Sequence, residues 1–134
     1  MQKKKDDYKR QLTLKGNEVK RSTKEFLYYV KDTETEEAKL KKMEEEKREP
    51  GDIKRQKDSV EECVGAKKQC FQNIEKFRKV CVDFLTLLET PCEDEEEQKK
   101  RNAAKELPEY TAAKDYIATA DDIIAKYGAE YEKK

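Results

Sequence analysis

Narrow rows of apolar residues at helical spacing run through segments of this chain that are otherwise densely charged. Between residues 8 and 47, apolar side chains recur at steps of three, four and seven, which is the period of one helix face and not of a strand. The remaining positions hold mostly Lys, Glu, Arg and Gln, which favour helix. A row this narrow is buried by packing against other helices, because the rest of each helix surface is charged. The row is Leu12, Val19, Phe26 and Leu40, with Thr33 at the missing step.

The composition excludes the other common architectures. Of the 134 residues, 31 are Lys or Arg and 31 are Asp or Glu, whereas only 34% are apolar. An α/β or all-β core would need roughly half of its residues to be apolar, and four Gly with three Pro are too few for a turn-rich sheet. Disordered charged chains usually carry a large net charge, and this chain carries none. We therefore predict an all-α protein, with no general basicity that would favour nucleic-acid binding.

A polar segment at 47–52 predicts the end of the first helix and the start of a second. Pro50 cannot continue a helix, Gly51 can adopt a positive φ angle, and Asp52 is a suitable N-cap. The second helix is predicted at 53–90, antiparallel to the first because the turn is short. Its wide apolar face indicates contact with two neighbouring helices. This face consists of two adjacent rows, Ile53, Val60, Val64, Phe71, Ile74, Cys81, Leu85 and Leu88, and Cys63, Cys70, Phe77 and Phe84.

A second polar segment separates this helix from a third. Thr90, Pro91 and Glu93 form a predicted N-cap with a capping box. The acidic and basic runs that follow have no apolar face, so we expect a charged, solvated connector at about 91–107, either a short helix or a mobile linker. The third helix is predicted at about 109–131, where apolar residues again step by three and four. They are Tyr110, Ala113, Ile117, Ala120, Ile124, Tyr127 and Tyr131.

The predicted fold is an elongated antiparallel three-helix bundle with coiled-coil-like packing, as in a spectrin repeat. Its helices lie at about 8–47, 53–90 and 109–131, within a single domain that spans residues 1–134. The second helix is expected to share both seams. The pattern leaves the oligomeric state open, because a narrow bundle can be a monomer or a homodimer.

The charges are unevenly distributed along the chain. Residues 1–24 hold nine basic and three acidic side chains, whereas residues 91–134 hold eight basic and twelve acidic ones. These charges are either ordinary solvated faces or a surface that steers a protein partner electrostatically.

The residues that enzymatic or cofactor chemistry requires are missing from the sequence. There is no His, no Gly-rich phosphate loop and no Gly-x-Ser-x-Gly motif. The carboxylate clusters at 44–46 and 95–97 lie on helix surfaces where no pocket is expected, so no catalytic residue, metal site or cofactor site is predicted. No Cys-x-x-Cys pair occurs, and the four cysteines are predicted to be free thiols in a reducing compartment. The chain has no apolar run that could span a membrane and no secretory signal, which favours a cytosolic protein.

The first helix and the region around the predicted turn contain the motifs Gln11-Leu12-Thr13-Leu14-Lys15, Val19-Lys20-Arg21 with Lys24-Glu25, Tyr29, Lys42-Met43 and Asp52-Ile53-Lys54-Arg55-Gln56. These motifs resemble those of the tubulin-folding cofactor A family. They occur in the first helix, around the predicted turn and at the start of the second helix, in the order and spacing of that family. The third helix is similar mainly in character, with Glu109-Tyr110 followed by an apolar stretch, and Ser22 and Thr23 stand where the family tends to have apolar residues.

The resemblance implies a cytoplasmic, cytoskeleton-associated, non-enzymatic chaperone. In that family the cofactor receives β-tubulin from the cytosolic chaperonin and holds it for assembly with α-tubulin, without a nucleotide. The candidate contact residues are charged positions predicted to be exposed beside the seams. They are Lys20, Arg21, Lys24 and Glu25 on the first helix, and Lys54 and Arg55 on the second.

Two other functions are compatible with the pattern. A structural coiled-coil or helical-bundle adaptor with no tubulin role would use the same helices to pair with itself or with other proteins. An RNA-associated helical protein would use the basic first 24 residues, and its binding would depend strongly on salt.

Overall fold

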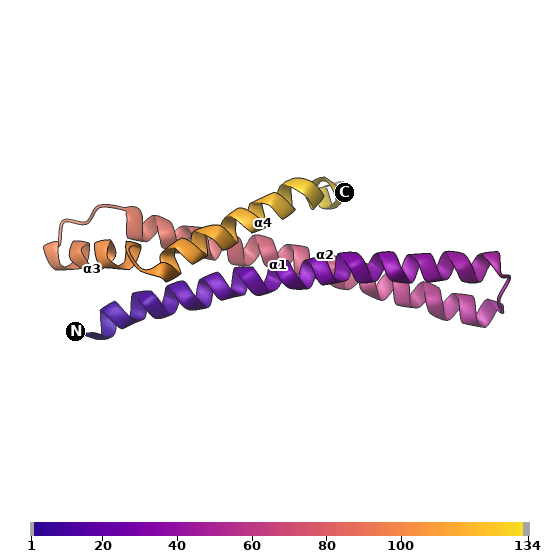
Figure 1. The fold of residues 1–134 in the computed structure, drawn as a ribbon. Coiled ribbons are helices and arrows are strands. Elements are labelled where there is room, and N and C mark those ends of the chain that lie inside the picture. Colours follow the sequence, from indigo (N-terminus) through magenta and orange to yellow (C-terminus); the bar gives the residue numbers. More distant parts are fainter. Residues whose placement is uncertain (1, 133–134) are drawn as a thin grey trace.

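The computed structural model describes residues 2–132, with side chains from 7 to 131, as a long helical hairpin on which two further helices pack (Figure 1). The basic side chains at 3–5, part of the predicted positive start, lie outside the described side chains. All regular secondary structure in the described range is α-helical, which confirms the predicted all-α class. None of the described helices is long and apolar enough to cross a membrane. The helices are α1 (Gln2–Glu45), α2 (Pro50–Glu89), α3 (Glu95–Lys105) and α4 (Pro108–Glu132).

The turn between α1 and α2 is built differently from the prediction. Lys47, not Gly51, adopts the left-handed backbone, with a φ angle of 56°. The next residue, Arg48, donates its backbone N–H to Met43 O at 3.0 Å and so closes the end of α1. Pro50 starts α2, where its missing N–H removes no helical hydrogen bond, and Glu49 replaces Asp52 as the N-cap. The prediction was wrong because a proline that ends one helix is equally suited to begin the next.

The core lies in the seam between α1 and α2 and is closed on one side by α4. The Phe26 ring centroid lies 5.6 Å from that of Phe71 on α2 and 5.0 Å from that of Tyr127 on α4. Tyr131 stacks on Phe71 with 4.6 Å between centroids. The buried set confirms most of the predicted rows. It includes Leu12, Val19, Phe26, Cys70, Phe71, Ile74, Cys81, Phe84, Leu85, Leu88, Tyr110, Ala113 and Ala120.

The third long helix covers only part of the hairpin. α4 ends at Glu132, near Phe71 and near Lys67, which pairs with Glu130 at 3.3 Å. Val64 lies one turn before Lys67 in α2, beyond the end of α4, and is therefore 45% exposed. The prediction that Val64 lies in a buried seam is wrong. Beyond this point the described molecule is a two-helix hairpin (Figure 1).

α4 packs more extensively on α1 than on α2. The prediction that α2 shares both seams is correct, but most of the surface on which α4 packs belongs to α1. Gly16 explains part of this difference, because a Cβ at that position would lie 3.5 Å from Ala113 Cβ and 3.3 Å from the Tyr116 ring. The absent side chain lets the two helices approach closely.

The predicted connector contains a packed helix rather than a mobile linker. Asp94 is the N-cap of α3 and accepts a hydrogen bond from Glu96 N at 3.0 Å, whereas Thr90, the predicted cap, ends α2. Ala104 is only 3% exposed, so the expectation that this segment buries nothing is also wrong. A single small residue leaves no readable apolar stripe in the sequence, although it suffices for helix contact.

Candidate partner-binding surface

The predicted contact residues on α1 are not all exposed. Arg21, Lys24 and Glu25 face solvent, and we call these three residues the α1 patch. Lys20 is half-buried, and its Nζ lies 5.6 Å from the ring centroid of Tyr116 on α4. This cation–π contact gives Lys20 a role in packing α4 on α1. Together with Asn17, these residues line a shallow depression of about 430 Å³.

The predicted contact residues on α2 lie far from the α1 patch. Lys54 and Arg55 are both exposed, and Arg55 pairs with Asp52 at 3.7 Å. Phe26, adjacent to the α1 patch, packs on Phe71, sixteen residues along α2 from Arg55. At about 1.5 Å per residue the two clusters are about 24 Å apart. The structure therefore does not bring the six predicted residues into one site.

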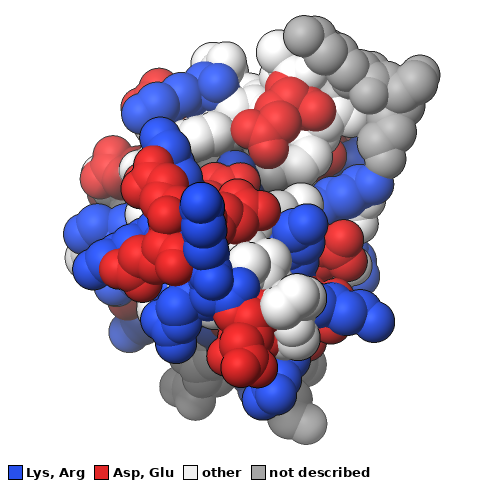
Figure 2. Space-filling model, turned by 90° about the vertical axis from the view of Figure 1, so that its right-hand side faces the viewer, with Lys and Arg blue, Asp and Glu red and all other residues white. Residues whose placement is uncertain are grey.

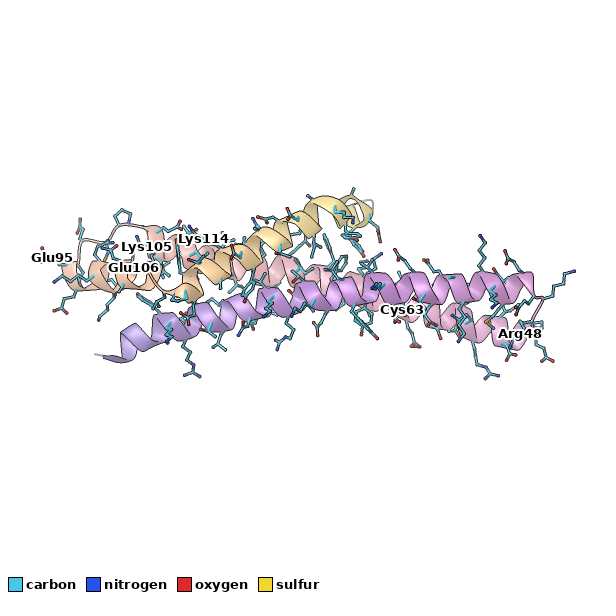
Figure 3. All side chains as sticks on the ribbon, viewed as in Figure 1. Arg48, Cys63, Glu95, Lys105, Glu106 and Lys114 are labelled. Atoms are coloured by element: carbon cyan, nitrogen blue, oxygen red, sulfur yellow. The ribbon has the colours of Figure 1, made fainter. Side chains whose placement is uncertain are left out.

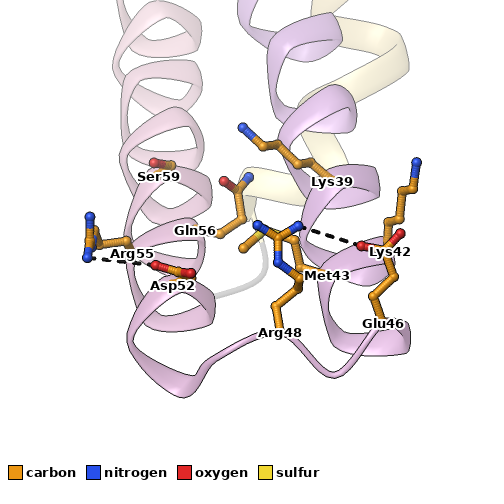
Figure 4. A pocket seen from close by; sticks show the side chains of 9 residues that line it. All are labelled: Lys39, Lys42, Met43, Glu46, Arg48, Asp52, Arg55, Gln56 and Ser59. Carbon is orange, nitrogen blue, oxygen red and sulfur yellow. Dashed lines mark ion pairs between the residues drawn. The ribbon is translucent and has the colours of Figure 1, made fainter.

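A groove opens between α1 and α2 at their joined ends (Figure 4). It has a volume of about 660 Å³, and we call it the hairpin groove. Its apolar floor is limited to Met43, which is 9% exposed. α1 provides Lys39, Lys42 and Met43, the turn provides Glu46 and Arg48, and α2 provides Asp52, Arg55, Gln56 and Ser59.

A buried polar contact crosses the seam at the inner end of this groove. Gln56 is 6% exposed, and its Nε2 donates to Glu36 O and to Glu36 Oε1, both at 2.9 Å. One turn earlier along α1, Thr33 is also buried, and its Oγ1 has no hydrogen-bond partner. Polar residues thus replace large apolar side chains where α4 no longer covers the hairpin.

Charges of both signs surround the hairpin end. Viewed along the rod from that end, basic and acidic side chains alternate and no large single-sign patch forms (Figure 2). Arg48 pairs with Glu46 at 3.6 Å, and Arg55 pairs with Asp52. Both pairs are solvent-exposed, so each contributes little to stability.

A second hollow, of about 460 Å³, lies beside Cys63 on the same two helices (Figure 3). Its wall contains Tyr28 and Tyr29, whose rings meet edge to face at 5.1 Å between centroids. The Cys63 thiol donates to Asp32 Oδ2 at 3.2 Å. This hydrogen bond, with burial as a smaller cause, raises the pKa of Cys63 to about 11.

All four cysteines are free thiols, as predicted, and they are expected to differ in reactivity. Burial keeps Cys70 and Cys81 inaccessible and raises the pKa of Cys81 to about 11. Iodoacetamide should therefore modify half-exposed Cys92 first, since a raised pKa also leaves Cys63 with little thiolate near about pH 8. Mass spectrometry of the native protein over time would measure the order, with the urea-unfolded chain as control. Equal rates for Cys63 and Cys92 in the native protein would contradict it.

Two polar clusters fasten the helices at the end opposite to Arg48 (Figure 3). In the first, the Tyr8 hydroxyl donates to Glu97, and Arg101 donates to Glu97 Oε2 at 3.0 Å and to Thr90 O at 2.9 Å. This cluster ties α3 to α1 and to the end of α2.

The second cluster ties the end of α2 to α4. The Tyr110 hydroxyl donates to Glu89, and Lys114 Nζ lies 3.5 Å from Glu89 Oε2. The hydrogen bond from Tyr110 is the main cause that lowers the pKa of Glu89. Both clusters hold the bundle together and lie away from the hairpin groove.

Sequence reasoning missed most of the groove. Lys39 and Arg48 have the pattern of ordinary solvated charges, and Lys42 and Met43 enter the sequence analysis only as a family motif. Only the proximity of the two helix ends across a short turn could have indicated a shared site. Gln56 belongs to the motif at 52–56, but its burial depends on its hydrogen bonds with Glu36 on α1. Within the described residues, no cluster of Cys, Asp and Glu side chains could hold a metal ion.

Known proteins resemble this chain in both sequence and structure. A family model described as tubulin binding cofactor A matches residues 7–117. No curated protein sequence matches the chain significantly. Among solved structures, it is similar to the crystal structure of tubulin folding cofactor A from Arabidopsis thaliana, with a TM-score of 0.68 and 26% sequence identity. That similarity covers 87% of this chain and 97% of the Arabidopsis chain.

Proposed function

The chain belongs to the tubulin binding cofactor A family, and from that premise we propose that it captures β-tubulin released by the cytosolic chaperonin and holds it for assembly with α-tubulin. Membership itself makes the chain a tubulin-binding folding cofactor of a non-enzymatic chaperone family. The proposal adds the β subunit as client, the chaperonin as its source, the absence of a nucleotide requirement, and a cytoplasmic, cytoskeleton-associated location.

The observation that carries the proposal is the extent of the family match. Residues 7–117 include nearly all of α1, all of α2 and α3, and the first part of α4. The match therefore covers the α1–α2 hairpin, α3, the start of α4 and both of the charged surfaces described above. A short local motif on a charged helix would carry far less weight.

The packing supports a partner that binds charged helix faces. The predicted rows are used to bury α1, α2 and α4 against one another. Outside these seams the exposed surface is mostly charged, so a partner of ordinary affinity would meet complementary charges first. We assign the initial contact to the α1 patch and a second, separate contact to Lys54, about 24 Å away. We assign Lys20 to packing, because it already contacts Tyr116.

The capture assay tests the function directly. The purified chain is incubated with β-tubulin released from the chaperonin and resolved on a native gel, with α-tubulin as the comparison client. A β-tubulin band that shifts with this chain supports the proposal. A folded chain that shifts neither tubulin but self-associates in light scattering would favour the structural adaptor instead.

Reversing two charges of the α1 patch is expected to weaken this capture. For the double variant Arg21→Glu/Lys24→Glu, we expect affinity for β-tubulin to fall by about tenfold, equivalent to about 1.4 kcal/mol. Both side chains are exposed, so the free energy of unfolding should change by less than about 0.5 kcal/mol.

The control is Lys41→Glu/Lys57→Glu, which makes the same charge change at exposed positions outside the α1 patch and outside the lining of the hairpin groove. Titration on native gels and urea unfolding would measure affinity and stability for both variants. An equal loss of affinity in both would show that overall charge, and not the patch, governs capture.

A further inference from the structure

We propose that the hairpin groove binds an acidic peptide segment of a partner protein. This inference goes beyond the proposed function, because it concerns a second surface about 24 Å from the α1 patch along α2. It also requires only that the partner carry a run of carboxylates. The argument rests on the charge, the hydrogen-bonding groups and the shape of the groove (Figure 4).

The lining has an excess of positive charge. Lys39, Lys42, Arg48 and Arg55 provide four cations against the two carboxylates Glu46 and Asp52, a formal excess of two. Both carboxylates are already paired with arginines of the same groove. Lys39 and Lys42, one turn apart on α1, have no ion pair within the described residues. Lys39 points toward α2 and Lys42 lies along the outer side of α1 (Figure 4), so an acidic segment with several carboxylates can meet both ammonium groups.

The two arginines can also change partners at little cost. The Arg48–Glu46 pair is 3.6 Å long with side chains 52% and 47% exposed, and the Arg55 side chain is 84% exposed. Exposed pairs of this kind hold their geometry weakly. A guanidinium that turns to a ligand carboxylate can form the bidentate contact that arginine favours.

The start of α2 presents N–H groups to the groove that no side chain caps. Its N-cap, Glu49, makes no side-chain hydrogen bond to the first turn, and Pro50 has no N–H to satisfy. The N–H groups of this first turn are therefore left without a side-chain cap beside Asp52 and Arg55, whereas the helix dipole adds little, because the C-terminal end of α1 lies in the same groove. This feature supports the site and does not define it, because the lysines carry most of the charge.

The mixture of groups fits a peptide better than a nucleic acid. A peptide offers backbone N–H donors as well as carboxylates, whereas a phosphate backbone offers acceptors alone. The groove has acceptors for those N–H groups in the carboxylates of Glu46 and Asp52 and in the hydroxyl of Ser59. The Gln56 amide nitrogen is occupied by Glu36, which leaves the Gln56 oxygen to accept.

The test uses a fluorescein-labelled hexaglutamate peptide as the probe. Its binding to the full chain is followed by fluorescence anisotropy at about 0.01 M and about 0.15 M salt, where the Debye length falls from about 30 Å to about 8 Å. We expect saturable binding that weakens at the higher salt. In Lys39→Glu/Lys42→Glu the affinity should fall by about tenfold or more, because two attractive contacts become repulsive.

The control for overall charge is again Lys41→Glu/Lys57→Glu, for which we expect less than about a threefold change. Equal losses in both variants, or no saturable binding to the wild-type chain, would overturn the inference. So would a single-stranded RNA of matched charge that binds more tightly than hexaglutamate and loses affinity in the same variant. Because the probe is a peptide and not tubulin, failure here leaves the capture assay unaffected, and failure of capture leaves this measurement unaffected.

Discussion

Phe26→Ala is expected to lower the free energy of unfolding by about 3–5 kcal/mol. Phe26 is fully buried, and its ring contacts Phe71 on α2 and both Tyr127 and Tyr131 on α4. Truncation would remove an aromatic ring of α1 that packs on both other long helices and would leave a cavity that rigid helices cannot close. Urea unfolding followed by circular dichroism would measure the loss.

The neighbouring residue provides a matched control. Leu27 follows Phe26 in the same turn of α1 but is 43% exposed, so Leu27→Ala should cost less than about 1 kcal/mol. Loss of the helical circular dichroism signal reports the unfolding of both variants. If Phe26→Ala destabilised the protein no more than Leu27→Ala, the register that places α4 against α1 would be wrong.

Ala113→Leu is expected to destabilise the bundle by about 1–3 kcal/mol through overpacking. Ala113 is fully buried on α4, and its Cβ lies 3.5 Å from where a Cβ on Gly16 of α1 would stand. The extra carbons of leucine have no space at this close approach. Gly16 cannot become smaller, so the two helices must move apart.

Ala118→Leu is the control for the change of side chain itself. Ala118 is exposed on the same helix, and its replacement should alter the free energy of unfolding by less than about 0.5 kcal/mol. Thermal or urea unfolding of both variants would measure the difference. An Ala113→Leu variant as stable as the control would show that α1 and α4 do not pack through Gly16.

The helices themselves could be predicted because their pattern is strongly periodic. The row through Leu12, Val19 and Phe26 lies in the core, as expected, and the third helix begins and ends close to the predicted residues. The boundaries were harder, because Pro50 can end one helix or start another and only the geometry of Lys47 and Arg48 decides between them.

The short helix α3 was only partly predictable. Its charges showed no stripe to bury, and a helix or a linker was equally compatible with them. Its position depends on Glu97 meeting Tyr8 and on Ala104 meeting the core, and both contacts join residues distant in sequence. Local propensity carries no information about such contacts.

The candidate binding residues were predicted as one set, and the structure divides them. Arg21 and Lys24 remain exposed on α1, Lys20 is engaged with Tyr116, and Arg55 belongs to the hairpin groove. Solvent exposure can be inferred from a helical pattern, but distance along a rod depends on where the turn is placed and which residues then pair across the seam.

By itself, the sequence determined that this protein is a set of long helices with charged outer faces, because the period of its apolar rows is a local property of the chain. Only the tertiary structure decided how far α4 reaches along the hairpin, and hence which part of the α1–α2 seam stays open. Phe71 and Val64 belong to one predicted row, yet one lies under Tyr131 and the other is exposed. Whether a residue of this row is buried depends on whether another helix packs on it. The apolar row on α2 carries no information about where α4 ends.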